Sequence, residues 1–104
     1  MFDLAARLQH EPSVTFRPVP PTEEAAPDGA VLLQPETRVY YTLDASGAQF
    51  WQLVDGHRTL EEIAATIARE RGDHVEAVEA ELSALARALL RDRFLRLVHE
   101  EPAP

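Results

Sequence analysis

The chain has 104 residues, 45% of them hydrophobic, which is enough for one folded domain with a modest core. Its 18 acidic residues outnumber its 10 lysines and arginines, and the net charge of −8 argues against a basic face for nucleic acid. The absence of cysteine excludes disulfides, cysteine-ligated zinc and a thiol nucleophile. No apolar run approaches the roughly 18 residues of a membrane span, so we expect neither a span nor a signal peptide, and we expect a cytoplasmic location.

The N-terminal part combines short hydrophobic patterns with prolines. Residues 1–12 are expected to form one or two amphipathic helical turns. Residues 14–18 alternate as an edge strand would, because Pro18 has no N–H to donate inside a sheet. The four prolines between residues 18 and 29 predict an extended loop.

The most hydrophobic stretch, "VLLQPETRVYYTL", predicts two antiparallel strands joined by one tight turn. The strands are expected over 30–34 and 38–43, and Pro35 suits the second position of a type I turn. Alternation divides the side chains of the second strand between two faces. Val39, Tyr41 and Leu43 are expected to face the helices, whereas Arg38, Tyr40 and Thr42 face away.

Three amphipathic helices are expected next. The first spans about 45–54, the second extends from Thr59 to Gly72, and the third runs from Asp73 to about residue 92. Their ends carry recognisable capping signals, and the third helix has a stripe of core residues. The caps are Asp44 or Ser46 before the first helix, Gly56 after it, the capping box of Thr59 and Glu62, and a second box of Asp73 and Glu76. The stripe consists of Val75, Val78, Leu82, Leu85 and Leu89.

The predicted fold class is α+β, with a three-stranded antiparallel sheet followed by a three-helix bundle. Residues 94–98, "FLRLV", form either a final short strand or a packed tail. Residues 1–13 are assigned to an N-terminal extension, 14–98 to the domain and 99–104 to a flexible tail. Because three strands do not close into a barrel, one outer strand keeps an unpaired edge.

The residues that could carry chemistry show no catalytic or metal-binding pattern. The four histidines have no metal-ligand spacing, the three serines lack a nucleophile-elbow setting, and the four glycines are isolated. The acidic side chains mostly fall on helix surfaces or in caps, and no catalytic pair stands out among them. We therefore expect a protein without enzymatic activity, cofactor or metal ion.

Three motifs in order, "VLLQPE", "VYYTLDASGAQFWQLVDGHRTLEEIAATIARE" and "LLRDRFLRLV", resemble the PqqD family, whose fold is also called the RiPP recognition element. The resemblance covers about residues 14–98. It depends on the spacing of the hairpin, the DG after the first helix and the T-x-x-E-I opening of the second helix. The chain departs from many relatives after the third helix, where it has "RDRFLRL" in place of a glycine.

The resemblance implies a winged-helix-like, non-catalytic domain that binds the leader segment of a ribosomally made precursor peptide. The leader would add a strand beside the third strand of the sheet and lie in a groove bounded by the third helix. The domain would deliver the peptide to a modifying enzyme, such as a radical enzyme or a leader protease with its cyclase. The class of natural product stays open, as does the choice between a monomer and a homodimer.

The candidate peptide-binding residues follow from this placement and from the helical pattern of the third helix. On the strand they are Arg38, Val39, Tyr40, Tyr41, Thr42 and Leu43, and on the helix they are Ala77, Glu81, Ala84, Leu85 and Ala88. Small side chains would let a peptide backbone approach closely. The opposite flank, with Glu79, Ser83, Ala86 and Leu90, is the alternative, and the alanines could equally be helix filler.

Two other classes of function compete with peptide binding. A winged-helix regulator that binds DNA has the same elements, but it normally has a basic recognition helix. An adaptor subunit would use the sheet edge to dimerise or to dock on an enzyme without a peptide ligand.

Overall fold

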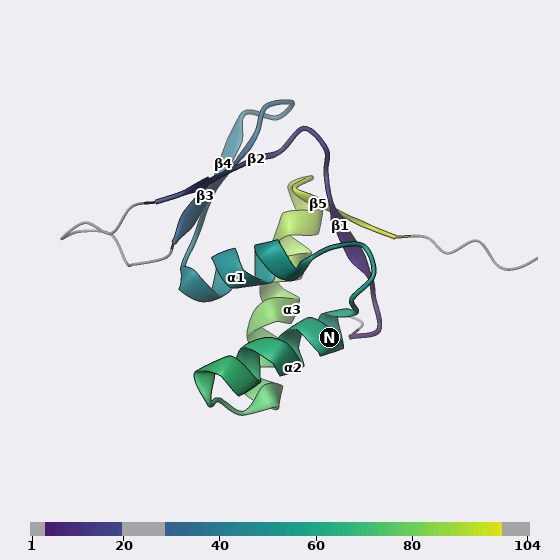
Figure 1. Cartoon of the computed structure of the whole chain (residues 1–104). Coiled ribbons are helices and arrows are strands. Elements are labelled where there is room, and N and C mark those ends of the chain that lie inside the picture. The colour runs from purple at the N-terminus through teal and green to yellow at the C-terminus, as the bar shows by residue number, and fades with distance from the viewer. Residues whose placement is uncertain (1–3, 20–28, 99–104) are drawn as a thin grey trace, which may run out of the picture.

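The computed structural model describes residues 4–19 and 29–98, which form an α+β domain (Figure 1). The predicted fold class is confirmed, and the "FLRLV" stretch contains a strand. Residues 20–28 of the predicted loop and the predicted tail 99–104 lie outside the described residues. In chain order the elements are β1 (Leu8–His10), β2 (Thr15–Pro18), β3 (Ala30–Gln34), β4 (Val39–Leu43), α1 (Ala45–Leu53), α2 (Leu60–Arg71), α3 (Val75–Arg91) and β5 (Leu95–Leu97).

The predicted three-stranded sheet consists of β2, β3 and β4, in that spatial order and antiparallel throughout. One face of the sheet is buried against the helices, since Ala30 and Leu32 are completely inaccessible to solvent. Figure 1 shows the sheet at one end of the molecule, α2 at the other end and α1 between them. The helices therefore cover only one face of the sheet and leave its outer face open.

The turn between β3 and β4 is one residue longer than the sequence predicts. The strand was expected to begin at Arg38, but β4 begins at Val39. Arg38 has a φ of 60°, in the left-handed region, and its N–H donates to the Gln34 carbonyl at 2.8 Å. A residue in this conformation closes the turn and cannot continue an extended strand.

The helix starts illustrate how local sequence sets local structure. Of the two candidate caps for α1, Asp44 is the one used, and its Oδ1 accepts from the Gly47 N–H at 2.8 Å. The predicted capping box of Thr59 and Glu62 is confirmed at the start of α2. Gly72 ends α2 as predicted, with a φ of 69° in the left-handed region that glycine adopts without strain.

Two of the predicted helix-end signals are wrong, although the predicted span of about 45–54 for the first helix agrees with α1. α1 already ends at Leu53, with Val54 as its extended cap, so Gly56 lies beyond the helix and its N–H donates to the Leu8 carbonyl. The predicted second capping box is absent, because His74 is the N-cap of α3 and makes no side-chain capping bond. The Asp73 carboxylate instead pairs with the Arg71 guanidinium at 2.8 Å, which takes it away from the helix end.

Two backbone hydrogen bonds close the C-terminal end of α3. The Phe94 N–H donates to the Leu89 carbonyl at 2.8 Å and the Arg93 N–H to the Leu90 carbonyl at 3.3 Å. This pair of bonds is a Schellman motif, which requires a left-handed residue after the helix. Arg93 occupies that position with a φ of 64°, although a side chain disfavours it.

The N-terminal helical turns predicted over 1–12 are wrong for residues 8–10. These residues form β1, which pairs with β5, and Leu8 is 1% exposed. The carbonyls of Ala6 and Leu4 accept from the first two N–H groups of α2, those of Leu60 and Glu61, at 3.0 and 2.9 Å. A helix start has unsatisfied N–H groups, and here the N-terminal segment supplies their partners.

The same segment also contacts α1. The His10 ring stacks on the Trp51 ring with centroids 3.9 Å apart, and its Nε2 donates to the Trp51 carbonyl at 2.7 Å. Segment 4–10 is therefore integrated into the fold, although the sequence placed it in an extension. β1 has only three residues, and its partner β5 is the last strand in the sequence. The residues around β1 therefore do not indicate that it forms a strand.

Most of the predicted stripe of α3 lies in one continuous core. Val78, Leu82 and Leu89 are buried, while Val75 and Leu85 are partly buried at its margin. The largest fully buried side chains include Phe50, Phe94, Leu60, Ile63 and Ile67. Of the helices in the described part of the chain, none combines the length and apolar character needed to cross a bilayer.

Candidate functional site

The strand β4 lies at an outer edge of the sheet. Its only partner among the described strands is β3, so one of its two sides carries no strand. An unpaired edge presents a row of backbone N–H and C=O groups to any extended chain that reaches it. Which residues supply those groups depends on the pairing pattern of the whole sheet.

The pairing pattern can be read from one hydrogen bond beyond the β2–β3 ladder. The Val19 N–H donates to the Gly29 carbonyl at 2.9 Å, in the register that pairs Pro18 with Ala30. Hydrogen-bonded and non-bonded pairs alternate along an antiparallel ladder, so Arg17 with Val31 is the next bonded pair. Pro18 therefore occupies a non-bonded position, where its missing N–H costs the ladder nothing.

The alternation carries through β3 to β4. Because Val31 and Leu33 direct their backbone groups toward β2, the intervening Leu32 directs its own toward β4, where it pairs with Tyr41. The N–H and C=O groups of Tyr40 and Thr42 consequently point away from the sheet. These four groups form the open edge of β4.

The side chains of β4 differ widely in exposure. Tyr40 is 68% exposed and Thr42 is also exposed, both on the outer face. Tyr41 is half-buried, and its ring packs edge-to-face against Phe94 with centroids 6.0 Å apart. Leu43 is buried in the core. Val39, at the start of the strand, is 38% exposed even though alternation assigns it to the inner face.

The candidate flank of α3 is the more accessible of the two flanks. Ala77, Glu81 and Ala84 are exposed, and Leu85 and Ala88 are half-buried. On the opposite flank Ser83 and Ala86 are buried, while Glu79 and Leu90 are half-buried. The first flank is therefore the one that an additional chain could reach.

Two sets of contacts connect β4, and the helix α1 that follows it, to α3 and its C-terminal end. At the middle of the strand, the Tyr41 ring packs against Phe94, which follows the C-terminal end of α3. Beyond its end, the Arg71 guanidinium reaches both Ser46 Oγ, at 2.8 Å on α1, and Glu81 Oε2, at 3.4 Å on α3. The first contact places the middle of β4 beside Phe94, just beyond α3, and the second joins α1, the helix that follows β4, to the part of α3 that bears Glu81.

The carboxylates with perturbed acidity lie in helix caps and turns. Hydrogen bonds from the backbone N–H groups of Arg58 and His57 lower the pKa of Asp55. A hydrogen bond from the backbone N–H of Thr59 lowers the pKa of Glu62. Both pKa shifts are caused by hydrogen bonds that stabilise a turn or a helix start. In the described part of the chain, no cluster of His, Asp or Glu is arranged to hold a metal ion.

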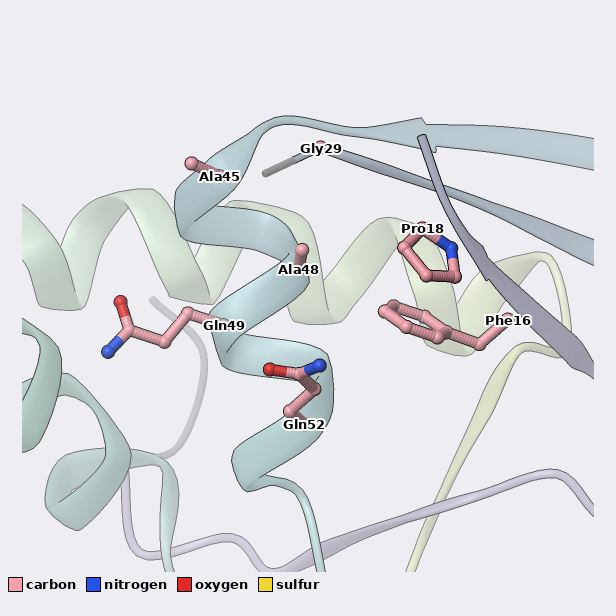
Figure 2. A pocket seen from close by; sticks show the side chains of 7 residues that line it. All are labelled: Phe16, Pro18, Gly29, Ala45, Ala48, Gln49 and Gln52. Carbon is pink, nitrogen blue, oxygen red and sulfur yellow. The ribbon is translucent and has the colours of Figure 1, made fainter. Parts of the chain in front are cut away.

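Two hollows beside the sheet are lined by described residues, and neither was expected from the sequence. One, of about 360 Å³, lies between β2 and α1, where the Phe16 and Pro18 rings face the helix (Figure 2). Its remaining lining residues are Gly29, Ala45, Ala48, Gln49 and Gln52. The other, of about 400 Å³, lies on the outer face of the sheet and is lined by Thr15, Arg17, Val31, Leu33 and Tyr40. Neither could be predicted, because each depends on which elements become neighbours.

Residues 29–95 match the model of the family described as "Coenzyme PQQ synthesis protein D (PqqD)". Among solved structures, the chain is similar to TbiB1 in complex with the TbiA(beta) leader peptide, with 28% identity and a TM-score of 0.69 over 92% of this chain and 99% of that one. It is also similar to the PqqD truncation of Methylobacterium extorquens PqqCD, described as a stand-alone RiPP recognition element. The identity there is 23% and the TM-score 0.74, over 92% of this chain and 95% of that one. No curated protein matches the chain.

Proposed function

The chain belongs to the PqqD family, and we propose that the open edge of β4 binds the leader segment of a ribosomally made precursor peptide. The observation that carries this proposal is the outward direction of the Tyr40 and Thr42 backbone groups. An extended peptide placed beside β4 would meet two donors and two acceptors with strand spacing. TbiB1, which is similar over nearly its whole length, was solved with a leader peptide, and this supports the proposal.

The sheet has a second edge, β2, but that edge is less suited to strand addition. By the same alternation, its outward groups belong to Phe16 and Pro18. Pro18 has no N–H, so the β2 edge lacks one of the donors that the β4 edge has. A proline at an edge is a common protection against pairing with other chains.

Side chains on both sides of the new strand would select the peptide. Peptide residues facing inward would meet Tyr41 and the α3 residues Leu85 and Ala88, which are half-buried. Ala77, Glu81 and Ala84 would form the exposed rim of this groove, and the alanines would allow a backbone to approach closely. The buried Leu43 and the turn residue Arg38 would support the ends of β4, with Val39 exposed at its start.

We further propose that the domain acts without catalysis and delivers the bound peptide to a modifying enzyme. A ribosomally made peptide is available in the cytoplasm, where it is translated, so the domain would act there. The net charge of −8 and the exposed backbone edge suit an extended peptide better than a nucleic acid.

A titration followed by ¹⁵N–¹H NMR tests the proposal. The probe is a synthetic peptide with the leader sequence of the precursor encoded beside the gene of this chain. We expect binding in the micromolar range or tighter, with amide signals of residues 39–43 and of residues 77–90 shifting or broadening. A control peptide that is N-methylated at alternate residues keeps its side chains but lacks the strand donors, and it should bind much more weakly. A response confined to another surface would refute the assignment of the site.

A further inference from the structure

Gln34 is a buried polar side chain at the end of β3, 1% exposed, and it forms hydrogen bonds through both its amide oxygen and its amide nitrogen. Its Oε1 accepts from the Ser13 hydroxyl at 3.1 Å and from the Glu36 N–H at 3.2 Å. Its Nε2 donates to the Arg93 carbonyl at 2.5 Å. A backbone N–H can only donate and a carbonyl can only accept, so these partners fix the orientation of the amide.

The three partners belong to different parts of the fold. Ser13 lies between β1 and β2, Glu36 lies in the β3–β4 turn, and Arg93 lies between α3 and β5. A buried donor or acceptor that loses its partner is strongly disfavoured. The amide therefore holds these three segments in a single relative arrangement.

We propose that Gln34 is a positioning residue that sets the separation between β4 and the C-terminal end of α3. Its backbone pairs with Val39, the first residue of β4, and its side chain holds Arg93, two residues beyond the last residue of α3. β4 and α3, the two walls of the proposed peptide groove, are therefore joined at one end of the groove through the Gln34 side chain. This inference rests on the proposed function, since it assigns the width of the proposed groove.

Toward the N-terminal end of α3, a weaker connection joins α3 to α1, the helix that follows β4. There Arg71 bridges Ser46 and Glu81, and its side chain is 35% exposed. Exposed ion pairs contribute little in water and are screened by salt. Gln34 makes its hydrogen bonds away from solvent, so it is the more rigid of the two connections.

The first test measures affinity for the leader peptide in the Gln34→Met variant, which keeps the side-chain length and loses the hydrogen bonds. If the fraction of molecules with the correct groove falls to about a tenth, the Kd rises about tenfold. The matched control is Ile63→Val, a core truncation in α2 that lowers stability without touching this connection. Below the melting temperatures of both variants, only Gln34→Met should bind more weakly.

The second test measures the groove directly and needs no peptide. The chain has no cysteine, so spin labels can be placed at T42C and A84C alone. Both positions are exposed, one on β4 and one on α3. Introducing Gln34→Met should broaden or lengthen the distance distribution between the labels, whereas Ile63→Val should leave it unchanged.

A third variant, Gln34→Glu, replaces the donor by a group that titrates. A carboxylate facing the Arg93 carbonyl is repelled, and burial raises the pKa of such a carboxyl, so the protonated form can restore the donor. This variant should bind the leader at acidic pH and lose affinity toward neutral pH, whereas the affinity of the unaltered chain should not fall as the pH rises toward neutral. It also provides the test if Gln34→Met does not fold.

The outcomes separate the two proposals. If the unaltered chain does not bind the leader, the proposed function fails, while the label distances still test the connection. If the unaltered chain and Gln34→Met bind equally well and give the same distances, the role assigned to Gln34 is overturned.

Discussion

Tyr40 and Thr42 lie two residues apart on β4 and direct their backbone N–H and C=O groups to the same open side of the sheet. Their side chains also share a face and are both exposed. The intervening residue, Tyr41, directs its backbone groups toward β3, where it pairs with Leu32. Its side chain points to the other face, where the ring packs on Phe94. β4 therefore has an open edge with exposed side chains at Tyr40 and Thr42, whereas Tyr41 is paired and packed.

Replacing Tyr40 by proline should strongly weaken binding of the leader peptide. The substitution removes one outward N–H, and Tyr40 makes no bond to β3 that proline would break. We expect at least a tenfold rise in Kd, measured by fluorescence polarisation of a labelled leader, with a smaller effect on the melting temperature than on affinity. The control Tyr40→Ala keeps the N–H and removes only the ring. Equal losses of affinity in both variants would mean that the side chain, and not the backbone, carries the interaction.

Removing residues 1–10 should destabilise the domain strongly, although the sequence suggests that they form an extension. The truncation exposes the surface that Leu8 covers and leaves the first two N–H groups of α2 without their carbonyl partners. We expect a loss of at least about 3 kcal/mol in the free energy of unfolding by urea.

A pair of point variants localises this effect. Leu8→Ala should cost about 2–5 kcal/mol, as is usual for a buried leucine. Its partner in the ladder, Leu97, is 42% exposed, so Leu97→Ala should cost less than about 1 kcal/mol. A cost below about 1 kcal/mol for Leu8→Ala as well would show that β1 does not contribute to the core.

Replacing Arg93 by glycine should stabilise the protein. Arg93 adopts a left-handed conformation that costs an ordinary residue about 1–2 kcal/mol and glycine very little. Allowing for the greater freedom of glycine in the unfolded chain, we expect a gain of up to about 1 kcal/mol, visible as a higher melting temperature. The control Arg91→Gly, at a helical position in α3, should destabilise by about 1 kcal/mol. A loss of stability in both variants would contradict the assigned role of Arg93.

Acid should weaken the start of α2 through Glu62. The pKa of this carboxyl lies below its ordinary value of 4.5, so its contribution to stability is complete above about pH 4.5 and is lost as the pH falls through the lower value. Glu62→Gln keeps an acceptor for the Thr59 N–H and removes the titration. Its melting temperature should therefore fall less steeply between pH 5 and about pH 3 than that of the unaltered chain. Glu61→Gln, outside the capping box, is the control, and an identical profile for Glu62→Gln and the unaltered chain would refute this account.

Features set by neighbouring residues could be predicted from the sequence. The box of Thr59 and Glu62, the glycine end of α2 and the β3–β4 hairpin each depend on residues within a few positions of one another. The exposure of Tyr40 and Thr42 follows from simple alternation along a strand with one buried face.

Features that depend on distant partners could not be predicted. The strand around Leu8 forms only because β5 returns to meet it from the end of the domain. The role of Gln34 depends on partners at Ser13 and Arg93, far from it in the sequence. The direction of the β4 backbone groups can be worked out only once the register of β2 against β3 is known. That register determines which residue pairs of the sheet are hydrogen-bonded.

Hydrogen exchange of individual β4 amides, measured by NMR with and without the leader peptide, tests the central claim most directly. In the free protein the Tyr40 and Thr42 amides should exchange rapidly, while that of Tyr41, bonded to β3, should be protected. Saturating leader peptide should slow exchange at Tyr40 and Thr42 by about tenfold or more and change Tyr41 much less. If the leader binds while the Tyr40 and Thr42 amides exchange as before, the peptide does not extend the sheet at β4.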